Sequence, residues 1–405
     1  MKRFCLSVAG MFLMLFGAFA QTTPKDSAAY KSRKLTFEEA NLVSSYYHQD
    51  GNNSAVTGGV GTEKLTDLSN AIDVKFVKYG KNDIKHSFDL ELGFDHYTSA
   101  SSDKVNPNTV SSASHADSRL FPSLNWSAEN AAKGRTIGAG ASFSSEYDYQ
   151  SIGFNLSFSQ KTKNRNGEFT AKVQAYMDQV SLIYPFELRT PQQQQQGDGE
   201  GENHYASTAR NSYSGSLSYS QIVNQRLQLS LIAEYIHQQG YLGLPFHRVY
   251  FTTGTLPKVE ALPDTRTKIP IGIRANYFIG DKVVLRSFYR YYHDDWGITA
   301  HTVQLETAIK FTPFFSVTPF YRYYTQSAVD YFAPYQAHLA SEQFYTSNYD
   351  LSKFNSNFYG AGFRMSPPKG VFGNKHINML ELRYGHYTKT TGMNANIVSL
   401  NFKFK

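Results

Sequence analysis

Residues 268–325 read KIPIGIRANYFIGDKVVLRSFYRYYHDDWGITAHTVQLETAIKFTPFFSVTPFYRYYT and repeat one pattern three times. Over Ile269–Ile279 apolar residues occupy nearly every second position, and most of the residues between them are polar or small. The alternation restarts at Val283, after the turn at Gly280-Asp281, and again at Val303. Successive side chains of a strand point to opposite faces, so a two-residue period predicts a β-strand. The stretch therefore predicts consecutive strands with little chain between them.

The length of these strands separates a membrane barrel from a soluble sheet. Each alternating segment runs for about ten residues or more, whereas strands of soluble sheets usually have about 5–6 residues. A tilted strand needs about 9–11 residues to cross a bilayer. We therefore predict an all-β fold, a transmembrane antiparallel up-and-down β-barrel.

The composition agrees with a barrel rather than with a helical membrane protein. The 405 residues are 15% aromatic and 18% charged, and the mean hydropathy is −0.44. A membrane helix needs about 20 consecutive apolar residues, and no such stretch follows residue 20. Barrel strands mix lipid-facing with lumen-facing residues, so their average is hydrophilic.

The first twenty residues have the features of a secretory signal peptide. Lys2 and Arg3 precede an apolar run, and Ala18-Phe19-Ala20 supplies a small-x-small cleavage site. The alternative is a membrane anchor, for which the apolar run is short. Cleavage after residue 20 removes Cys5, the one cysteine of the chain, so we expect neither disulfides nor thiolate metal sites in the mature protein.

The chain divides into a signal peptide (1–20), a periplasmic lead-in (21–36) and a barrel (37–405), which we predict to have about 16 strands. The low-complexity segment 187–209 is expected to be disordered. Outer-membrane barrels have short periplasmic turns and longer external loops. The predicted short connections lie near residues 80, 130, 164, 225, 281, 313 and 370, and the predicted long loops near 55, 108, 197, 252 and 340.

The end of the chain supports the same architecture. Val398, Leu400, Phe402 and Phe404 alternate with other residues up to Lys405. This pattern is similar to the carboxy-terminal signal that barrel-assembly machinery recognises, although here the aromatic residue is penultimate. We therefore expect that machinery and the outer-membrane lipid to be partners of the chain.

The opening strand and loop resemble those of a known family. The segments are Glu39-Ala40-Asn41-Leu42, Tyr46-Tyr47-His48-Gln49-Asp50-Gly51 and Gly58-Gly59-Val60-Gly61-Thr62. They resemble the start of an uncharacterised family of predicted Gram-negative outer-membrane proteins, described as a domain of unknown function. The resemblance implies an outer-membrane location after signal removal. It transfers no catalytic residue, because the family has no assigned activity.

Charged residues share one face of the predicted strands. An arginine facing hydrocarbon near the bilayer midplane costs roughly 2–4 kcal/mol, so this face must look into the lumen. The charges form either an ion-pair network that holds the barrel's shape or a transverse field across a water-filled pore. The candidates for lining the lumen and setting its selectivity are Arg274, Arg286, Arg290, Arg322, Arg364 and Arg383 with Glu306 and Glu381 in the carboxy-terminal half, and Asp89 and Glu91 in a more acidic amino-terminal wall.

Histidines and tyrosines gather near the predicted strand ends. Aromatic girdles at the two membrane interfaces explain most of these tyrosines, and stacking against sugar rings is the alternative. Imidazoles and nearby aspartates suit a divalent metal at the mouth, but their spacing matches no metal motif and no metal is assigned. The histidines concerned are His48, His96, His293 and His386.

The sequence contains no motif of an enzyme. It has no zinc-binding His-Glu-x-x-His, no Gly-x-Ser-x-Gly elbow and no phosphate-cradling loop, so no cofactor is predicted. The net charge of +7 comes without a run of Lys or Arg, and nucleic acid is not expected as a partner. We predict a passive pore or uptake channel for small solutes. The alternatives are a structural or assembly barrel serving a partner protein complex and, less favoured, an outer-membrane enzyme.

Overall fold

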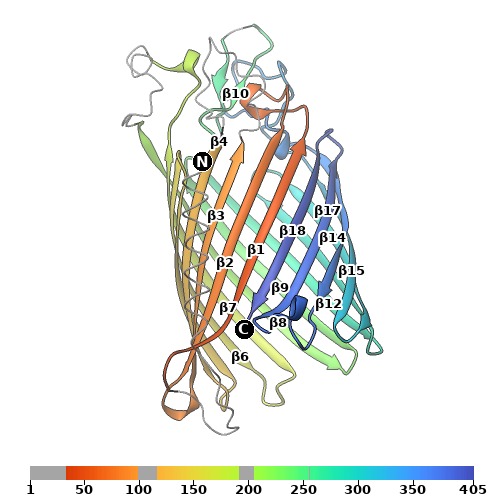
Figure 1. Cartoon of the computed structure of the whole chain (residues 1–405). Coiled ribbons are helices and arrows are strands. Elements are labelled where there is room, and N and C mark those ends of the chain that lie inside the picture. Colours follow the sequence, from red (N-terminus) through yellow and green to blue (C-terminus); the bar gives the residue numbers. More distant parts are fainter. Residues whose placement is uncertain (1–32, 99–115, 191–204, 255) are drawn as a thin grey trace.

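The computed structural model describes residues 33–98, 116–190, 205–254 and 256–405. Within them the chain forms a closed antiparallel barrel of sixteen strands (Figure 1). Strands that follow one another in the chain are neighbours in the barrel, and the last strand pairs with the first. The predicted all-β, up-and-down architecture is confirmed. The predicted signal peptide, most of the lead-in and the low-complexity residues 191–204 lie outside the described residues.

The barrel strands contain between 11 and 18 residues, which suits a tilted crossing of a bilayer. They are β1 (Thr36–Asp50), β2 (Leu65–Tyr79), β3 (Lys85–Thr98), β4 (Ala116–Asn130), β5 (Arg135–Ser145), β6 (Tyr149–Lys161), β7 (Gly167–Ser181), β8 (Ser207–Asn224), β9 (Leu227–Gly240), β12 (Thr265–Ile279), β13 (Val283–Asp294), β14 (Thr299–Thr312), β15 (Phe315–Gln326), β16 (Phe354–Met365), β17 (Ile377–Lys389) and β18 (Asn394–Phe404).

The remaining elements are short and lie in the connections. They are the hairpin strands β10 (Arg248–Val249) and β11 (Lys258–Val259) and the 3-10 turns η1 (Ala55–Thr57), η2 (Lys81–Asp83), η4 (Phe186–Leu188), η5 (Tyr349–Leu351) and η6 (Val371–Gly373). In the part of the chain that the structure describes, no helix has the length and apolar character needed to span a membrane.

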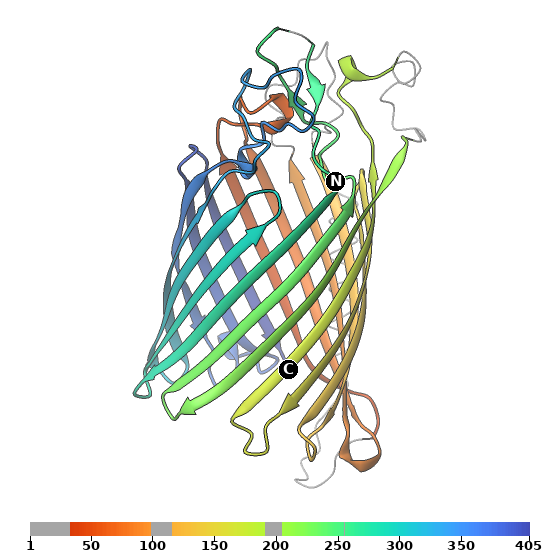
Figure 2. The ribbon, with the colours of Figure 1, turned by 180° about the vertical axis from the view of Figure 1, so that it is seen from behind.

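The two ends of the barrel differ in their connections. One end carries short turns such as 225–226 and 280–282, whereas the other carries the long loops 51–64, 241–264 and 327–353 (Figures 1 and 2). This confirms the predicted separation of short periplasmic turns from long external loops. The external end also has three short connections, at 146–148, 295–298 and 390–393. They are not among the predicted turns and loops.

The outer face of the barrel is apolar and exposed. Ile273, Tyr289 and Val303 pair across β12, β13 and β14, and their side chains are 40%, 40% and 50% exposed. Because side chains alternate along each strand, the residues on either side of these three point inward. The exposed band is the lipid-facing surface that the alternation predicted.

Two clusters of buried apolar residues lie at the external end, among the described residues. One contains Trp296, Ile298 and Val329, and the other contains Val249, Phe251 and Tyr345. Loops 241–264 and 327–353 contribute to these clusters, so part of the external loop region is packed like a small domain core.

The structure differs from the sequence prediction at the start of β8. The segment 187–209 is predicted to be disordered, whereas η4 spans Phe186–Leu188, and β8 begins at Ser207 and pairs with β7 from its first residue. Residues 207–212 are mostly polar on both faces, so no alternation marks them. Their backbone hydrogen bonds to β7 and β9 make them part of the barrel wall.

Candidate functional site

The strand register places the predicted arginines on the face opposite to the lipid-facing residues. A contact between distant strands shows that this face is the lumen. Arg383 Nη2 on β17 lies 3.0 Å from Glu306 Oε2 on β14, although β15 and β16 separate the two strands. Side chains can approach one another across intervening strands only on the concave inner surface.

Some of the lumen arginines have carboxylate partners and others do not. Glu306 accepts hydrogen bonds from both Arg286, at 2.7 Å, and Arg383. Arg364 lies opposite Glu381 in the register of β16 and β17. In the described residues neither Arg290 nor Arg322 forms an ion pair; the guanidinium of Arg322 lies 5.0 Å from the ring centroid of Phe358, and that of Arg274 lies 5.4 Å from the ring centroid of Phe288.

Acidic residues face the lumen from the opposite wall. Asp89 and Glu91 lie on β3 and Asp73 on β2, all at inward positions of the register. Asn41 donates to Asp73 at 3.3 Å, and Ser123 donates to Glu91 at 3.3 Å. In the closed strand order β3 is directly opposite β13, and β2 is opposite β12. The wall that carries Asp89 and Glu91 therefore faces β13, which carries Arg286 and Arg290.

External loops from opposite sides of the barrel meet across its mouth. Loop 51–64 joins β1 to β2, whereas loop 241–264 joins β9 to β12 on the far side of the ring. Arg248 Nη1 donates to the carbonyl oxygen of Val56 at 2.9 Å. Its Nε and Nη2 donate to the Glu187 carboxylate at 2.5 and 3.1 Å. One buried guanidinium thus ties three external loops together over the mouth.

Loops 241–264 and 327–353 are joined by a second buried contact. Glu260 is 5% exposed and accepts a hydrogen bond of 2.5 Å from Thr346 Oγ1. We call the described residues of loops 51–64, 241–264 and 327–353 the cap. Its contacts cross the external mouth of the barrel.

Two glycines allow loop 51–64 to fit into the cap. Gly58 and Gly59 have φ angles of +83° and +87°, a region that L side chains rarely adopt. A Cβ atom on Gly58 would lie 2.5 Å from the ring of Tyr250, and one on Gly59 would lie 2.6 Å from the carbonyl oxygen of Ser347. The Gly-rich segment therefore serves close packing of loops.

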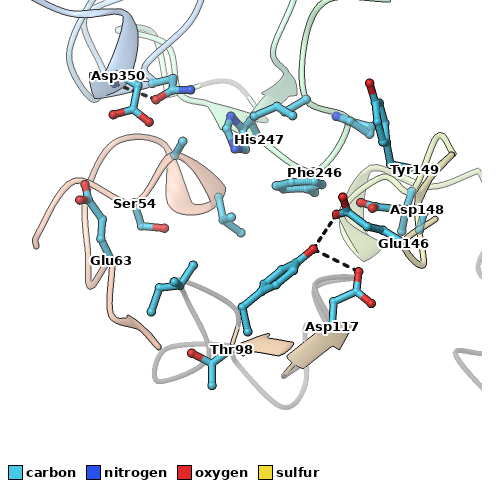
Figure 3. A pocket seen from close by; sticks show the side chains of 18 of the residues that line it. Ser54, Glu63, Thr98, Asp117, Glu146, Asp148, Tyr149, Phe246, His247 and Asp350 are labelled. Atoms are coloured by element: carbon cyan, nitrogen blue, oxygen red, sulfur yellow. Dashed lines mark hydrogen bonds between the residues drawn. The ribbon is translucent and has the colours of Figure 1, made fainter. Parts of the chain in front are cut away.

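A cavity of about 570 Å³ lies between the cap and the upper barrel wall (Figure 3). On one side the carboxylate oxygens of Asp117, Glu146 and Asp148 lie within 4.8 Å of one another. Glu63 and Asp350 line the opposite side. Burial, followed by repulsion from Asp117 and Glu146, raises the pKa of the Asp148 carboxyl. Carboxylates thus line the cavity on both sides.

Part of this acidic cluster is already held by neighbouring side chains. Tyr97 donates its hydroxyl proton to Glu146 Oε2 at 2.6 Å, and Arg119 Nε lies 3.4 Å from Glu146 Oε1. Asp117 accepts from the backbone N–H of Tyr147 at 3.3 Å. These contacts explain how the carboxylates are tolerated so close together, and we assign no metal to them.

The structure does not bring the candidate metal-binding histidines together. They lie on β1, β3, β13 and β17, and the register turns them outward rather than toward the mouth. Each Nδ1 instead lies 2.9–3.3 Å from a side chain of the next strand. The residues concerned are His48, His96, His293 and His386.

Consecutive tyrosines at the strand ends divide between the two faces. Tyr46 points outward and is 48% exposed, whereas Tyr47 points inward and donates to Gln49 at 2.6 Å. In the same way Tyr291 points outward and Tyr292 points inward. An aromatic girdle therefore explains one member of each pair, and the other belongs to the lumen wall.

Sequence reasoning missed the residues that hold the cap and line the cavity. Arg248, Glu260, Glu146 and Asp148 lie in connections without periodic pattern, and their partners are distant in sequence. The available signal was the presence of isolated charges within aromatic-rich external loops.

The cap is expected to loosen in acid. Burial, the largest single influence, raises the pKa of the Glu187 carboxyl, but the hydrogen bonds to Arg248, a backbone hydrogen bond and the charges of Arg248 and Arg189 together lower the pKa below its usual 4.5. A carboxyl with a lowered folded-state pKa stabilises the fold above its ordinary pKa, and that contribution is lost as the pH falls through the folded value. We therefore expect external access to the lumen to rise below about pH 4.5.

The measurement is the rate at which a membrane-impermeant reagent labels a cysteine placed in the lumen, followed from about pH 7 to about pH 3 with correction for intrinsic thiol reactivity. In E187Q the rate should already be higher at neutral pH and should depend less on pH. Identical pH profiles for the two proteins would show that this ion pair does not hold the cap.

The chain is similar to one protein family and to several solved structures. A family model described as "Protein of unknown function (DUF3570)" matches residues 17–397. The comparison with curated proteins finds no match. Similar solved structures include a BenF-like porin from Pseudomonas fluorescens Pf-5, with 9% identity, a TM-score of 0.43 and coverage of 93% of this chain and 100% of that one. Another is OccK1 (OpdK) of Pseudomonas aeruginosa, with 7% identity, a TM-score of 0.41 and coverage of 93% and 99%.

Proposed function

We propose that this chain, which belongs to the DUF3570 family of proteins of unknown function, forms a water-filled pore through the outer membrane and admits small solutes passively. The observation that carries the proposal is the division of charge inside the barrel. Acidic residues of β2 and β3 face arginines of β12 and β13 across the lumen. Opposed walls of charge set the selectivity of an aqueous channel.

The size of the barrel supports a pore. Barrels of about 16–18 strands leave an aqueous channel unless loops plug them. Here the cap lies across the external mouth, so passage depends on whether its contacts open. Arg290 and Arg322 lie below the cap without a carboxylate partner among the described residues, so both guanidinium groups are available to a passing anion.

The location we infer is the outer membrane of a Gram-negative bacterium. The predicted signal peptide, the exposed apolar band and the separation of long loops from short turns support this location. The alternating apolar residues of β18 support recognition by the barrel-assembly machinery. Lipid of the outer membrane is the expected environment of the outer face.

The pore is tested by single-channel recording of the refolded protein in a planar bilayer with a salt gradient. We expect steady conductance with a preference for anions, and R286S/R290S should weaken that preference. A unit charge about 7 Å from an ion changes its energy by about 0.6 kcal/mol in a water-like medium. Loss of one such charge weakens the attraction of an anion and the repulsion of a cation by this amount each, so it lowers the anion-to-cation permeability ratio roughly sevenfold.

A control variant of equal charge change is K133S/K163S, in which both lysines lie exposed in turns at the periplasmic end. It should leave selectivity near the wild-type value. A barrel that inserts but stays silent contradicts the pore, and a protein complex that co-purifies with it would favour the alternative of a structural or assembly barrel.

A further inference from the structure

A motif repeats at the external strand ends and has no part in the pore. On five strands an aromatic residue is followed two positions later by a histidine, within three residues of the strand's external end. Residues two apart on a strand share one face. The five segments are Tyr46-Tyr47-His48 on β1, Phe94-Asp95-His96 on β3, Tyr235-Ile236-His237 on β9, Tyr291-Tyr292-His293 on β13 and Tyr384-Gly385-His386 on β17.

All five aromatic–histidine pairs face outward. Tyr46, Tyr235 and Tyr384 are 48%, 54% and 46% exposed, and Tyr46 pairs with the lipid-facing Val398 of β18. Each histidine lies one outward position closer to the external end than its aromatic partner. Aromatic girdles mark the boundary of the hydrocarbon region. The five histidines, which we call the histidine belt, therefore lie at the level of the outer-leaflet head groups.

Each imidazole of the belt is held in the same way. Its Nδ1 lies 2.9–3.3 Å from a polar side chain at the directly opposite position of the neighbouring strand. In the described residues, none of the five forms a hydrogen bond through Nε2, which is the ring nitrogen farther from the backbone. In each histidine of the belt, Nδ1 is thus held by the neighbouring strand, whereas Nε2 is available to a ligand outside the barrel. The partners are Thr66, Ser118, Thr267, Thr299 and Asn396.

Most carboxylates near the histidine belt point into the lumen. Asp95 points inward and accepts from Ser69, and Asp294 points inward and pairs with Arg266. At the external ends of the described strands Asp50 is the one carboxylate at an outward position. The outward surface at this level therefore offers imidazole nitrogens and neutral hydroxyls, a surface suited to an anionic oxygen.

We propose that the histidine belt binds phosphate groups of lipid head groups in the outer leaflet. An imidazole N–H donates to a phosphate oxygen, and a nearby phosphate favours the charged form of histidine and strengthens the bond. Because each histidine lies next to an aromatic residue of the girdle, its contact with a phosphate lies at the boundary of the hydrocarbon region. The proposal rests on the membrane placement inferred above, but it is independent of conduction through the lumen.

The test compares bisphosphorylated lipid A with the same lipid after removal of its phosphates, by native mass spectrometry of the detergent-solubilised barrel. We expect the wild-type protein to bind the phosphorylated lipid at least about tenfold more tightly. In the variant H48N/H96N/H237N/H293N/H386N this preference should disappear. Asparagine places an amide near the position of Nδ1 and so keeps the cross-strand bond, but it has no counterpart of Nε2.

The matched control is H86N. His86 also faces outward, but at the opposite end of the barrel, where it accepts from Trp126 Nε1 at 3.3 Å. It should keep the wild-type preference. The heat-dependent shift in gel mobility verifies folding of each variant, and H96N/H293N replaces the five-site variant if that one does not fold.

Three outcomes would contradict the proposal that the histidine belt binds lipid phosphates. They are equal binding of the two lipids by the wild-type protein, an undiminished preference in the histidine variant, or release of the lipid by inorganic phosphate alone, which would indicate a site for small anions. A protein that fails to insert into bilayers contradicts the membrane placement itself. A barrel that inserts without discriminating between the lipids contradicts only the belt.

Discussion

Replacing Asp294 with alanine is expected to destabilise the barrel by about 3–5 kcal/mol, the usual cost of breaking a buried ion pair. Asp294 is 1% exposed and lies at the external end of β13. Its Oδ2 accepts from Arg266 and from the hydroxyl of Tyr292, at 2.5 and 2.7 Å. Its Oδ1 accepts from the backbone N–H groups of Trp296 and Ile298, at 3.1 and 2.9 Å.

The expected loss of stability is large because alanine leaves buried polar groups without their hydrogen-bond acceptor. The guanidinium of Arg266 loses its carboxylate while its side chain stays largely buried, and the two N–H groups of the turn lose their acceptor. The measurement is urea-induced unfolding from lipid vesicles, followed by tryptophan fluorescence. D295A is the control: Asp295 is exposed and accepts from Thr267 N, so its loss should cost about 1 kcal/mol or less. Equal effects of D294A and D295A would contradict this account.

Arg248→Ala is expected to open the cap. The substitution removes one hydrogen bond that joins Arg248 to Val56 across the mouth and two that join it to Glu187 in the nearby connection between β7 and β8. Hydrogen bonds to charged groups contribute about 1.5–3 kcal/mol each, and the partial exposure of Glu187 reduces that contribution. A loss of about 2–3 kcal/mol shifts the ratio of closed to open cap roughly 30- to 150-fold.

The measurement for R248A is open probability in single-channel recordings, with solute influx into vesicles as a second readout. The control is K258A, because Lys258 lies in the same small hairpin but is exposed and contacts the ring of Phe251 at 5.1 Å. Wild-type gating in R248A would show that the cap does not limit passage, and the acidic cavity would then be open as it stands.

The sequence predicts the barrel well because the barrel depends on a local, periodic property. Alternation over residues 268–325 determines which side chains meet lipid, and the cost of placing an arginine in hydrocarbon then assigns Arg286 and Arg290 to the lumen. The same rule assigns Asp89 and Glu91 to the lumen, but their place across from β13 emerges only from the closed strand order.

The cap was beyond sequence reasoning for a physical reason. The bond between Arg248 and Val56 joins residues 192 positions apart, and no periodicity links the two loops. Histidines such as His48 were placed at the mouth because polar residues at a strand end suit either face. One position in the register decides between them, and Tyr46, exposed to lipid, shows that His48 shares its outward face.

The pairing of β1 with β18, from Ala40 opposite Phe404 to Asp50 opposite Asn394, bears on the order in which this protein is made. A ribosome produces the two strands of that seam at opposite ends of the barrel sequence, so the seam can form only after the last strand has been made. Until then both margins of the growing sheet offer unpaired N–H and C=O groups to any passing strand. The entropic cost of closing so long a loop grows only slowly with length. The main hazard for the unfinished protein is therefore unwanted pairing at its two open edges, rather than the entropic cost of closing the barrel.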